Sequence, residues 1–570
     1  MKNRFKEELV ITDQLKARVR EALTIASGKG IFQTNVSKVD ISFETPRNKE
    51  FGDFACNLAM TLSKTLGLPP REIAKTIVDN IRMGDGFLER VEIAGPGFMN
   101  FYLTPDWLHE VLVRIEKEDE SYGCNRSHEG EKVLIEFVSA NPTGPISVVN
   151  GRAAALGDTL GNLLAASGAV VSREFYVNDA LNSTQLNLMG DSLAARYLQL
   201  LGRDVELPED GYQGEYLVDI AKDILEEFGN RFENMPDEER ASLFRSFASS
   251  KMIEQQKSDL ETFGVKYDTW FYESDLYSNE EVSAAIQYMR DHGYAYEKDG
   301  ALWLKTMELA NDDQDRVLVR SNEKETYVAA DAAYHLNKFK RGFNRLIDIW
   351  GADHHGYVSR LKAGIKALGC DPEACEIILT QMVLLMRDGE LVRGSKRAGD
   401  IIPLKDLVEE VGKDAARFYF LLNSYETTAT FDLELAKKQS NDNPVFYAQY
   451  AHARCCNVLR KAEEMNVAVP KGTNVKRSLL INDKELELLR KLADYPGEVQ
   501  TAADMLAPHR LTTYVREIGQ ALHQFYEECP ALKEGVNPDL RDARLALFDA
   551  TRIVVRNLLG LLGVSSPQRM

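Results

Sequence analysis

The 570-residue sequence has few cysteines, no long apolar run and a deficit of positive charge. Its seven cysteines are scattered without CxxC spacing, which indicates neither a disulfide framework nor a structural zinc site. No window contains the roughly 18 uncharged apolar residues that a membrane helix needs, and charged residues occupy the N-terminus where a signal peptide would be apolar. We therefore expect a cytoplasmic protein with no membrane contact.

Charge is unevenly distributed along the chain. The 69 Lys and Arg residues against 88 Asp and Glu residues give a net charge of −19, which excludes nucleic-acid binding through a general positive field. Residues 203–240 contain four basic and thirteen acidic residues, whereas 437–484 contain nine basic and four acidic residues among several aromatics. The second segment is typical of a local contact with unstacked RNA bases, although a solvated helix face has the same composition.

The order of periodic segments predicts three modules. Residues 1–115 mix helical and strand patterns and form an N-terminal α+β unit. The apolar strand 133–138, the Pro/Gly-rich loop 141–145, the helix 152–166 and the strand 170–176 together make a βαβ unit with a parallel sheet. Residues 120–405 are therefore predicted as an α/β, Rossmann-type domain with a helical insertion at about 180–300 and further strands at 345–350 and 376–380. Residues 406–570 are predicted as an all-α helical bundle, with Pro444 opening one helix. Ligands of such sheets bind beyond the carboxyl ends of the strands, here at the loop 139–151.

Three separated segments carry a resemblance to a known family. They are 139–158 (SANPTGPISVVNGRAAALGD), 387–399 (RDGELVRGSKRAG) and 436–444 (AKKQSNDNP) with 450–454 (YAHAR). Shorter matches at 52–55 and 567–570 extend the similarity over essentially the whole chain. The sequence resembles the arginyl-tRNA synthetases, which are class I aminoacyl-tRNA synthetases.

The resemblance implies an activity and its partners. ATP, entering as its magnesium complex, would activate L-arginine to arginyl-adenylate, and the arginyl group would pass to the terminal adenosine of tRNA. The family typically needs bound tRNA before activation, so we expect this requirement here. The N-terminal unit is expected to touch the tRNA elbow and the C-terminal bundle to bind the anticodon. We expect a monomer without a protein-bound structural metal.

The same resemblance assigns candidate site residues. Catalytic positions are Lys396, Ser395, Asn150 and Ser147. Candidate ATP contacts are Pro142, Thr143, Gly144, Pro145, Val148, Val149, Gly151, Arg152, Gly351, Asp353 and His354. Candidate arginine contacts are Glu136, Ser139, Asn141, Tyr327 and Asp331, and candidate tRNA contacts are Tyr447, Tyr450 and Met570.

Elementary chemistry agrees with the principal assignments. A guanidinium group presents five donors and keeps its charge, so its site needs acceptors and a carboxylate. Tyr327 and Asp331 are four residues apart and share one face of a helix. Lys396 lies between Gly394 and Gly399, as expected for a cation that moves toward a leaving pyrophosphate.

The sequence also departs from the family pattern. The nucleotide loop reads Ser-Val-Val-Asn at 147–150 where His-Val-Gly-His is usual, and no histidine occurs between His128 and His292. Asn150 keeps an amide donor, but Val149 adds a branched side chain where glycine permits close approach. The lysine loop reads Arg-Gly-Ser-Lys in place of Lys-Met-Ser-Lys. An alternative hypothesis is a catalytically degenerate paralogue that binds arginine or tRNA as a regulator; a synthetase for another amino acid would leave Tyr327 and Asp331 unexplained.

Three further features have two interpretations each. Asp353, His354 and His355 suggest a metal, but no fourth ligand is near in sequence, and an ATP-lining strand end fits better. The bases Lys338, Lys340, Arg341 and Arg345 form either a patch for the tRNA acceptor end or a solvated turn. Tyr447 and Tyr450 face one side of a helix, where they either stack on anticodon bases or pack inside the bundle.

Overall fold

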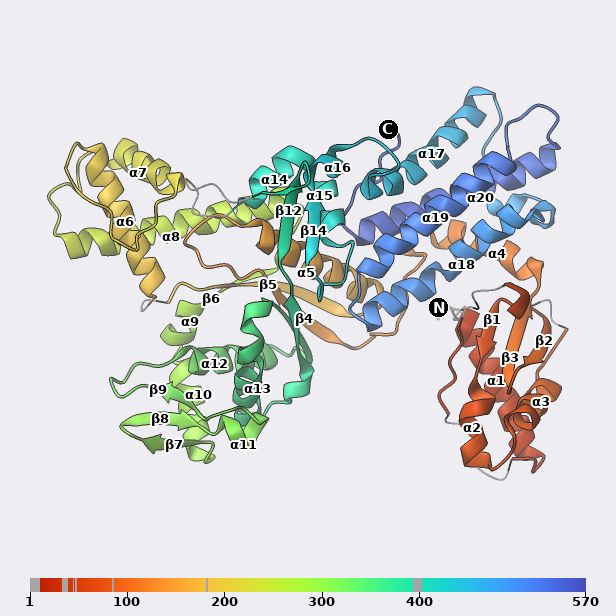
Figure 1. Ribbon diagram of the computed structural model, residues 1–570, viewed down its shortest axis with the longest axis horizontal. Coiled ribbons are helices and arrows are strands. Elements are labelled where there is room, and N and C mark those ends of the chain that lie inside the picture. Colours follow the sequence, from red (N-terminus) through yellow and green to blue (C-terminus); the bar gives the residue numbers. More distant parts are fainter. Residues whose placement is uncertain are drawn as a thin grey trace, which may run out of the picture.

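The structure is a computed structural model that describes residues 11–32, 39–44, 46, 49–84, 87–180, 183–392 and 402–570. A parallel sheet lies at its centre, with a helical arm at one end and the N-terminal unit and the C-terminal helices at the other (Figure 1). No helix in these ranges is both long and apolar enough to cross a bilayer.

The central sheet has five parallel strands in the order β11-β10-β4-β5-β6. The strands are β4 (Lys132–Phe137), β5 (Val170–Val177), β6 (Thr269–Tyr272), β10 (Arg345–Gly351) and β11 (Cys375–Thr380). The chain leaves β4 toward β5 on one side and returns with β10 on the other, so β4 lies at the switch point where such sheets bind ligands. The predicted α/β parallel sheet is confirmed; β6 falls in a region that we expected to be helical.

Helix α5 (Val148–Ala166) crosses from β4 to β5 and is buried along most of its length. It begins four residues before the predicted start because Ser147 and Asn150 form a reciprocal capping box. Small residues let the helix approach the sheet closely: a Cβ on Gly157 would lie 2.3 Å from the Phe137 ring. The position of this helix therefore fixes its N-terminus beside the carboxyl end of β4.

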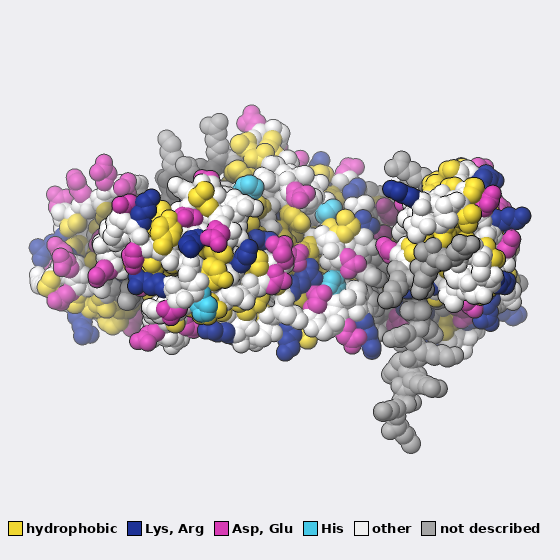
Figure 2. All heavy atoms as spheres, turned by 90° about the horizontal axis from the view of Figure 1, so that it is seen from below, with side chains coloured by type: hydrophobic (Ala, Val, Ile, Leu, Met, Phe, Trp, Pro, Cys, Tyr) yellow, Lys and Arg dark blue, Asp and Glu magenta, His cyan; other side chains and the backbone are white. Residues whose placement is uncertain are grey.

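Two insertions follow β5. The first is the acidic helical arm of α6 (Thr184–Leu200), α7 (Glu215–Phe228) and α8 (Asp237–Thr262). Figure 2 shows acidic side chains gathered at this end of the molecule. The second insertion packs helices against the antiparallel sheet β7-β8-β9. Its elements are α9 (Glu273–Ser278), α10 (Glu281–Asp291), β7 (Ala295–Lys298), β8 (Ala301–Leu304), α11 (Thr306–Ala310), β9 (Arg316–Val319) and α12 (Tyr327–Lys340). After β10, η3 (Ala352–Tyr357) and α13 (Val358–Ala367) lead to β11, and α13 packs against α11 and α12.

The N-terminal unit has an antiparallel sheet in the order β1-β3-β2. Its elements are α1 (Ile11–Gly28), β1 (Phe54–Cys56), α2 (Leu58–Leu66), α3 (Pro70–Asn80), β2 (Leu88–Ala94) and β3 (Phe98–Leu103). Helix α4 (Pro105–Glu118) follows and packs against the C-terminal helices.

The C-terminal part is mainly helical, as predicted. Its long helices are α17 (Pro444–Glu464), α18 (Asp483–Asp504), α19 (His509–Glu528) and α20 (Pro538–Leu561). A small sheet precedes them, with β12 (Val383–Arg387), β13 (Glu390–Leu391) and β14 (Ala429–Asp432), together with α14 (Leu404–Val411), α15 (Lys413–Phe420) and α16 (Leu433–Lys437). Strand β14 is an exception to the expected helices, since its four residues pair in parallel with β12.

Candidate active site

The backbone is strained directly after β4. Val138 and Ser139 have φ angles of 72° and 40°, a region that branched side chains rarely adopt. This turn aims the Ser139 hydroxyl back at the strand, where it donates to Glu136 Oε1 over 2.8 Å. Ser139 Oγ in turn accepts a hydrogen bond from the backbone N–H of Tyr176 in β5 at 3.2 Å. Two of the predicted arginine contacts, Glu136 and Ser139, therefore lie together at the switch point.

The loop after β4 is held by the helical arm. Gln256 in α8 donates to the carbonyl oxygens of Asn141, at 3.1 Å, and Gly144, at 2.9 Å. The Tyr216 hydroxyl in α7 donates to the Thr143 carbonyl oxygen at 2.7 Å. The arm therefore fixes the backbone of the loop that resembles the family's nucleotide loop, a role that the sequence did not reveal.

The N-terminus of α5 is built by the residues that replace the two histidines. Ser147 Oγ accepts a hydrogen bond from the backbone N–H of Asn150 at 3.2 Å and donates one to the side-chain oxygen Asn150 Oδ1 at 2.6 Å. Among the described residues, neither Asn150 Nδ2 nor the Val149 backbone N–H has a partner. Val149 is 42% exposed, so its branched side chain adds bulk toward solvent. These donors at a helix N-terminus suit an anionic ligand.

Two predicted ATP contacts next to this turn, Gly151 and Arg152, also have packing roles. Arg152 is 1% exposed and donates to three carbonyl oxygens, of Gln381, Ser424 and Thr427, at 2.8–2.9 Å. These oxygens take three of the five N–H donors of the guanidinium, which gives Arg152 a structural role, and its contact with ATP stays a prediction. Gly151 faces α14, since a Cβ there would lie 2.5 Å from Leu404. The sequence pattern could not separate these roles from nucleotide binding.

A cluster of carboxyl groups lies beyond the ends of β4, β5 and β6. The pKa of Asp331 is raised to about 6, mainly by burial and in smaller part by the charge of Glu136. A 2.5 Å hydrogen bond from the Tyr357 hydroxyl and the charges of His335 and Lys338 oppose this shift. Burial and the charge of Asp331 raise the pKa of Glu273 to about 7. The Tyr176 hydroxyl is buried and has no hydrogen-bond partner among the residues that the structure describes, and burial together with the charges of Glu273 and Asp331 raises its pKa. The cluster can therefore stabilise a cation that offers several donors.

Glu273 was missed by the sequence analysis. It is 3% exposed and forms no hydrogen bond or ion pair with any described residue. Asp179, after β5, fixes the start of α9 by accepting from the Ser274 amide at 2.9 Å and hydroxyl at 2.7 Å. The available signal was an acidic residue directly after the aromatic segment 269–272, which forms β6.

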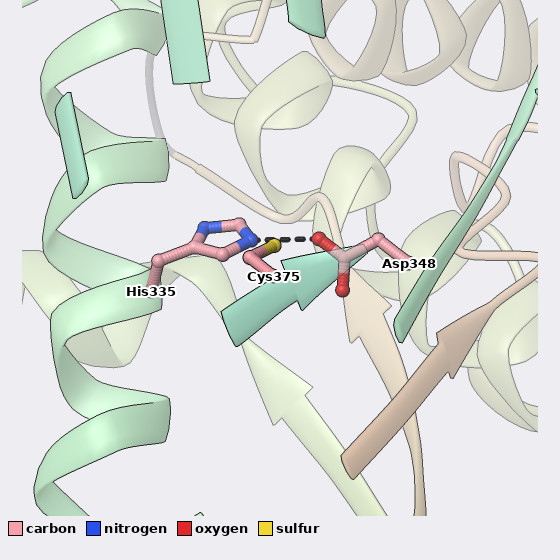
Figure 3. Close-up of side chains that lie close together, drawn as sticks. All are labelled: His335, Asp348 and Cys375. Carbon is pink, nitrogen blue, oxygen red and sulfur yellow. Dashed lines mark hydrogen bonds and ion pairs between the residues drawn. The ribbon is translucent and has the colours of Figure 1, made fainter. Parts of the chain in front are cut away.

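A second buried group lies behind this cluster. His335 in α12, Asp348 in β10 and Cys375 in β11 have potential ligand atoms within 4.8 Å of one another (Figure 3). The Lys338 ammonium, however, lies 2.9 Å from Asp348 Oδ1 and 3.5 Å from His335 Nε2. Burial also raises the pKa of the Cys375 thiol well above its usual value. A cation of the protein itself thus occupies this space, and the group fits an ion-pair network better than a metal site.

The chain matches three family models of aminoacyl-tRNA synthetases along its length. Residues 111–455 match the family model described as tRNA synthetases class I (R), catalytic domain. Residues 13–103 match the arginyl tRNA synthetase N terminal domain, and 448–570 match the DALR anticodon binding domain. The chain belongs to the class I arginyl-tRNA synthetases. The predicted family and enzyme class are thereby confirmed.

Individual relatives of this synthetase match over nearly its whole length. The arginine–tRNA ligases of Carboxydothermus hydrogenoformans and Desulforamulus reducens are 47% and 45% identical to it, and each alignment covers 98% of this chain and 100% of the relative. A solved Campylobacter jejuni structure is 33% identical, with a TM-score of 0.76 over 82% of this chain and 100% of that one. The Thermus thermophilus arginyl-tRNA synthetase structure, at 20% identity, shares the fold with a TM-score of 0.73 over 98% and 100% of the two chains.

Four of the remaining predicted substrate contacts of the synthetase, Tyr327, Asn141, Asp353 and His354, have exposed side chains. Tyr327 is 67% exposed on the first turn of α12. Asp353 and His354 are exposed on η3, directly after Gly351. Asn141 is exposed, and its amide donates to Gln185 at 2.6 Å. Ser395 and Lys396 lie outside the described residues, and Pro142, Pro145 and Val148 are partly or fully buried around the loop.

The predicted tRNA contacts are two tyrosines of α17, Tyr447 and Tyr450, and the C-terminal Met570. Tyr447 packs on α19, where a Cβ on Gly519 would lie 2.9 Å from its ring. Tyr450 stacks on Phe446 with ring centroids 6.0 Å apart. Met570 is 51% exposed. Both tyrosines are half-buried, and the Arg454 guanidinium lies 4.7 Å from the Tyr450 ring centroid, so each has packing partners as well as accessible surface.

The bases Lys338, Lys340, Arg341 and Arg345 do not form the free basic patch that was one of their two interpretations. Lys338 is fully buried and bonded to carboxylates, and the Arg341 guanidinium pairs with Glu174. Arg345 forms ion pairs with Glu131, at 3.0 Å, and Glu376, at 2.6 Å. Only Lys340 of this group is left exposed without a described ion pair. Three of these bases form ion pairs with acidic residues that precede them by more than 160 residues in the sequence.

Proposed function

We propose that this arginine–tRNA ligase binds L-arginine at the carboxyl ends of β4, β5 and β6, with its guanidinium between Asp331 and Glu273. One observation carries the assignment: two carboxyl groups with raised pKa values and a buried, unpartnered Tyr176 hydroxyl lie together at the switch point. A guanidinium supplies the missing positive charge and donors. Glu136 and Ser139, on the strand side, are placed to meet the polar groups of the amino acid's backbone.

ATP, as its magnesium complex, is the second substrate. Its triphosphate lies at the start of α5, where the Asn150 amide and the Val149 N–H are available donors. The arginine carboxylate attacks the α-phosphorus in line, and pyrophosphate leaves. Lys396 neutralises the developing charge on this leaving group. Positioning and charge neutralisation carry this step, without a covalent enzyme intermediate.

The tRNA then receives the arginyl group at its terminal adenosine. The anticodon lies against α17, beside Tyr450 and Met570, and the N-terminal unit contacts the elbow. Bound tRNA is required before arginine is activated, and the enzyme acts as a cytoplasmic monomer. The full-length relatives carry the ligase name, and no observation favours the degenerate regulator.

ATP–pyrophosphate exchange tests this proposal. Exchange that depends on arginine and tRNA, and that is lost in both Asp331→Ala and Lys396→Ala, supports it. Binding of arginine and tRNA without any exchange would support a regulator. Exchange driven by another amino acid would overturn the arginine site. Sedimentation with and without tRNA tests the monomer.

A further inference from the structure

The face of α12 that packs on the sheet carries charged residues that the proposed reaction does not use. His335, Lys338 and Arg341 follow Asp331 at intervals of four, three and three residues, so all four share one side of the helix. Lys338 is 0% exposed, which is rare for a lysine unless it is paired. Lys338 is therefore a buried cation on the same side of α12 as Asp331, the proposed guanidinium contact.

The sheet presents a row of carboxylates to this face. Glu136 in β4 is the register partner of Asp348 in β10 and of Glu174 in β5. Register partners in a parallel sheet point to the same face, so three acidic side chains lie side by side across adjacent strands. Like charges in neighbouring positions repel each other. The row is therefore stable only with matching cations.

Helix α12 supplies these cations. Lys338 Nζ lies 2.6 Å from Glu136 Oε2 and 2.9 Å from Asp348 Oδ1, so it bridges two of the three carboxylates. Arg341 donates to both oxygens of Glu174, at 2.6 and 2.8 Å. Burial lowers the pKa of Lys338, but the charges of Asp348 and Glu136 outweigh it and raise that pKa. Lys338 thus carries its charge beneath the arginine site.

The network reaches the substrate residues on both sides. Glu136 receives Lys338 on one oxygen and the Ser139 hydroxyl on the other, which fixes the plane of its carboxylate. His335 lies between Asp348 Oδ2 and the Asp331 carbonyl oxygen, at 2.7 Å from each, and so ties the backbone of the guanidinium-binding residue to β10. Any shift of Lys338 would therefore be felt at the substrate side of Glu136.

We infer that Lys338 is a positioning residue for arginine binding: its ammonium orients Glu136 and offsets one of the two negative charges of the Glu136–Asp348 pair, which favours Asp331 and Glu273 as the groups that receive the guanidinium. This inference rests on the proposed arginine site. Without Lys338, the unpaired carboxylates at Glu136 and Asp348 would form a second acidic site that competes for the cationic substrate.

A double-mutant cycle on the full-length enzyme with tRNA tests the inference. Exchange kinetics are measured for Lys338→Met, Glu136→Gln and the double variant, with Lys340→Met, on the exposed side of α12, as the matched control. Lys338→Met raises the arginine KM roughly 10–100-fold and leaves the ATP KM within about twofold. Because Lys338 acts through Glu136, the double variant has an arginine KM close to that of Glu136→Gln alone.

Several outcomes would overturn the inference. These are an unchanged arginine KM in Lys338→Met, equal changes in the arginine and ATP KM, or effects of the two single variants that multiply in the double variant. If Lys338→Met does not fold, Lys338→Gln, which removes the charge but keeps an N–H donor, takes its place in the same cycle and is judged by the same three results. A wild-type enzyme without arginine-dependent exchange would instead overturn the proposed function, and this inference with it.

Discussion

The Tyr357 hydroxyl donates a hydrogen bond to Asp331 Oδ2 over 2.5 Å. The bond stabilises the ionised carboxylate and so lowers a pKa that burial raises. Tyr357 belongs to the segment 350–357, which the sequence assigned to the ATP site. It therefore links the segment proposed to line the ATP site with the proposed arginine contact Asp331.

The Tyr357→Phe variant should weaken arginine binding in a pH-dependent way. Loss of the hydrogen bond raises the pKa of Asp331 further above 6. The arginine KM should increase about 3–10-fold near pH 6.5 and much less at pH 8.5. Arginine KM against pH is the measurement, with Tyr288→Phe on the exposed face of α10 as the control. A uniform change across pH would contradict the role of the hydrogen bond.

The carboxyl cluster also predicts how stability depends on pH. The folded-state pKa values of Asp331, about 6, and Glu273, about 7, exceed unfolded values of roughly 4. These groups therefore favour the folded state most when protonated, and their contribution falls as pH rises from about 4 to 7. Bound arginine pairs with the ionised forms, so binding should release protons and strengthen with pH over this window.

Thermal unfolding checks this linkage. Arginine should raise Tm more at pH 8 than at pH 5.5, and calorimetry in buffers of different ionisation enthalpy should show proton release near pH 6.5. Glu273→Gln, which removes one titrating carboxyl while keeping its shape, should flatten the dependence. An equal arginine-induced Tm shift at both pH values would show that these carboxyls do not bind the ligand.

The sequence predicted the frame of this site better than its charges. The run 133–138 is almost continuously apolar, and the Gly- and Ala-rich helix after it is buried on nearly every side, so the βαβ unit was predicted correctly. Glu273 was missed because β6 has only four residues, all half-buried, within a largely helical region. The burial of Lys338 was missed because one of its partners, Glu136, is 202 residues away, and a single sequence does not reveal such pairs.

Substitutions of Arg152 can separate a structural role of this residue from a role in ATP binding. Arg152→Met should lower the free energy of unfolding by about 2–4 kcal/mol, since three buried carbonyl oxygens lose their donors. Arg152→Lys should recover only part, because an ammonium does not span the same acceptors. Urea unfolding gives the stability, and the ATP KM of the folded fraction should stay unchanged. A raised ATP KM with normal stability would identify Arg152 as an ATP contact.

Asn150 combines a cap with a candidate ATP contact, and two substitutions separate these roles. Asn150→Ala removes the capping oxygen and should lower stability by about 1 kcal/mol while raising the ATP KM. Asn150→Asp keeps an oxygen for Ser147, so stability is preserved, but it loses the amide donor and adds a negative charge beside the triphosphate. The ATP KM should then rise about tenfold or more with the arginine KM unchanged. Lys340→Met, on the exposed side of α12, is the control and should alter neither quantity. If Asn150→Asp behaved like wild type toward ATP, Asn150 would be a helix cap alone, and the phosphates would have to be bound elsewhere.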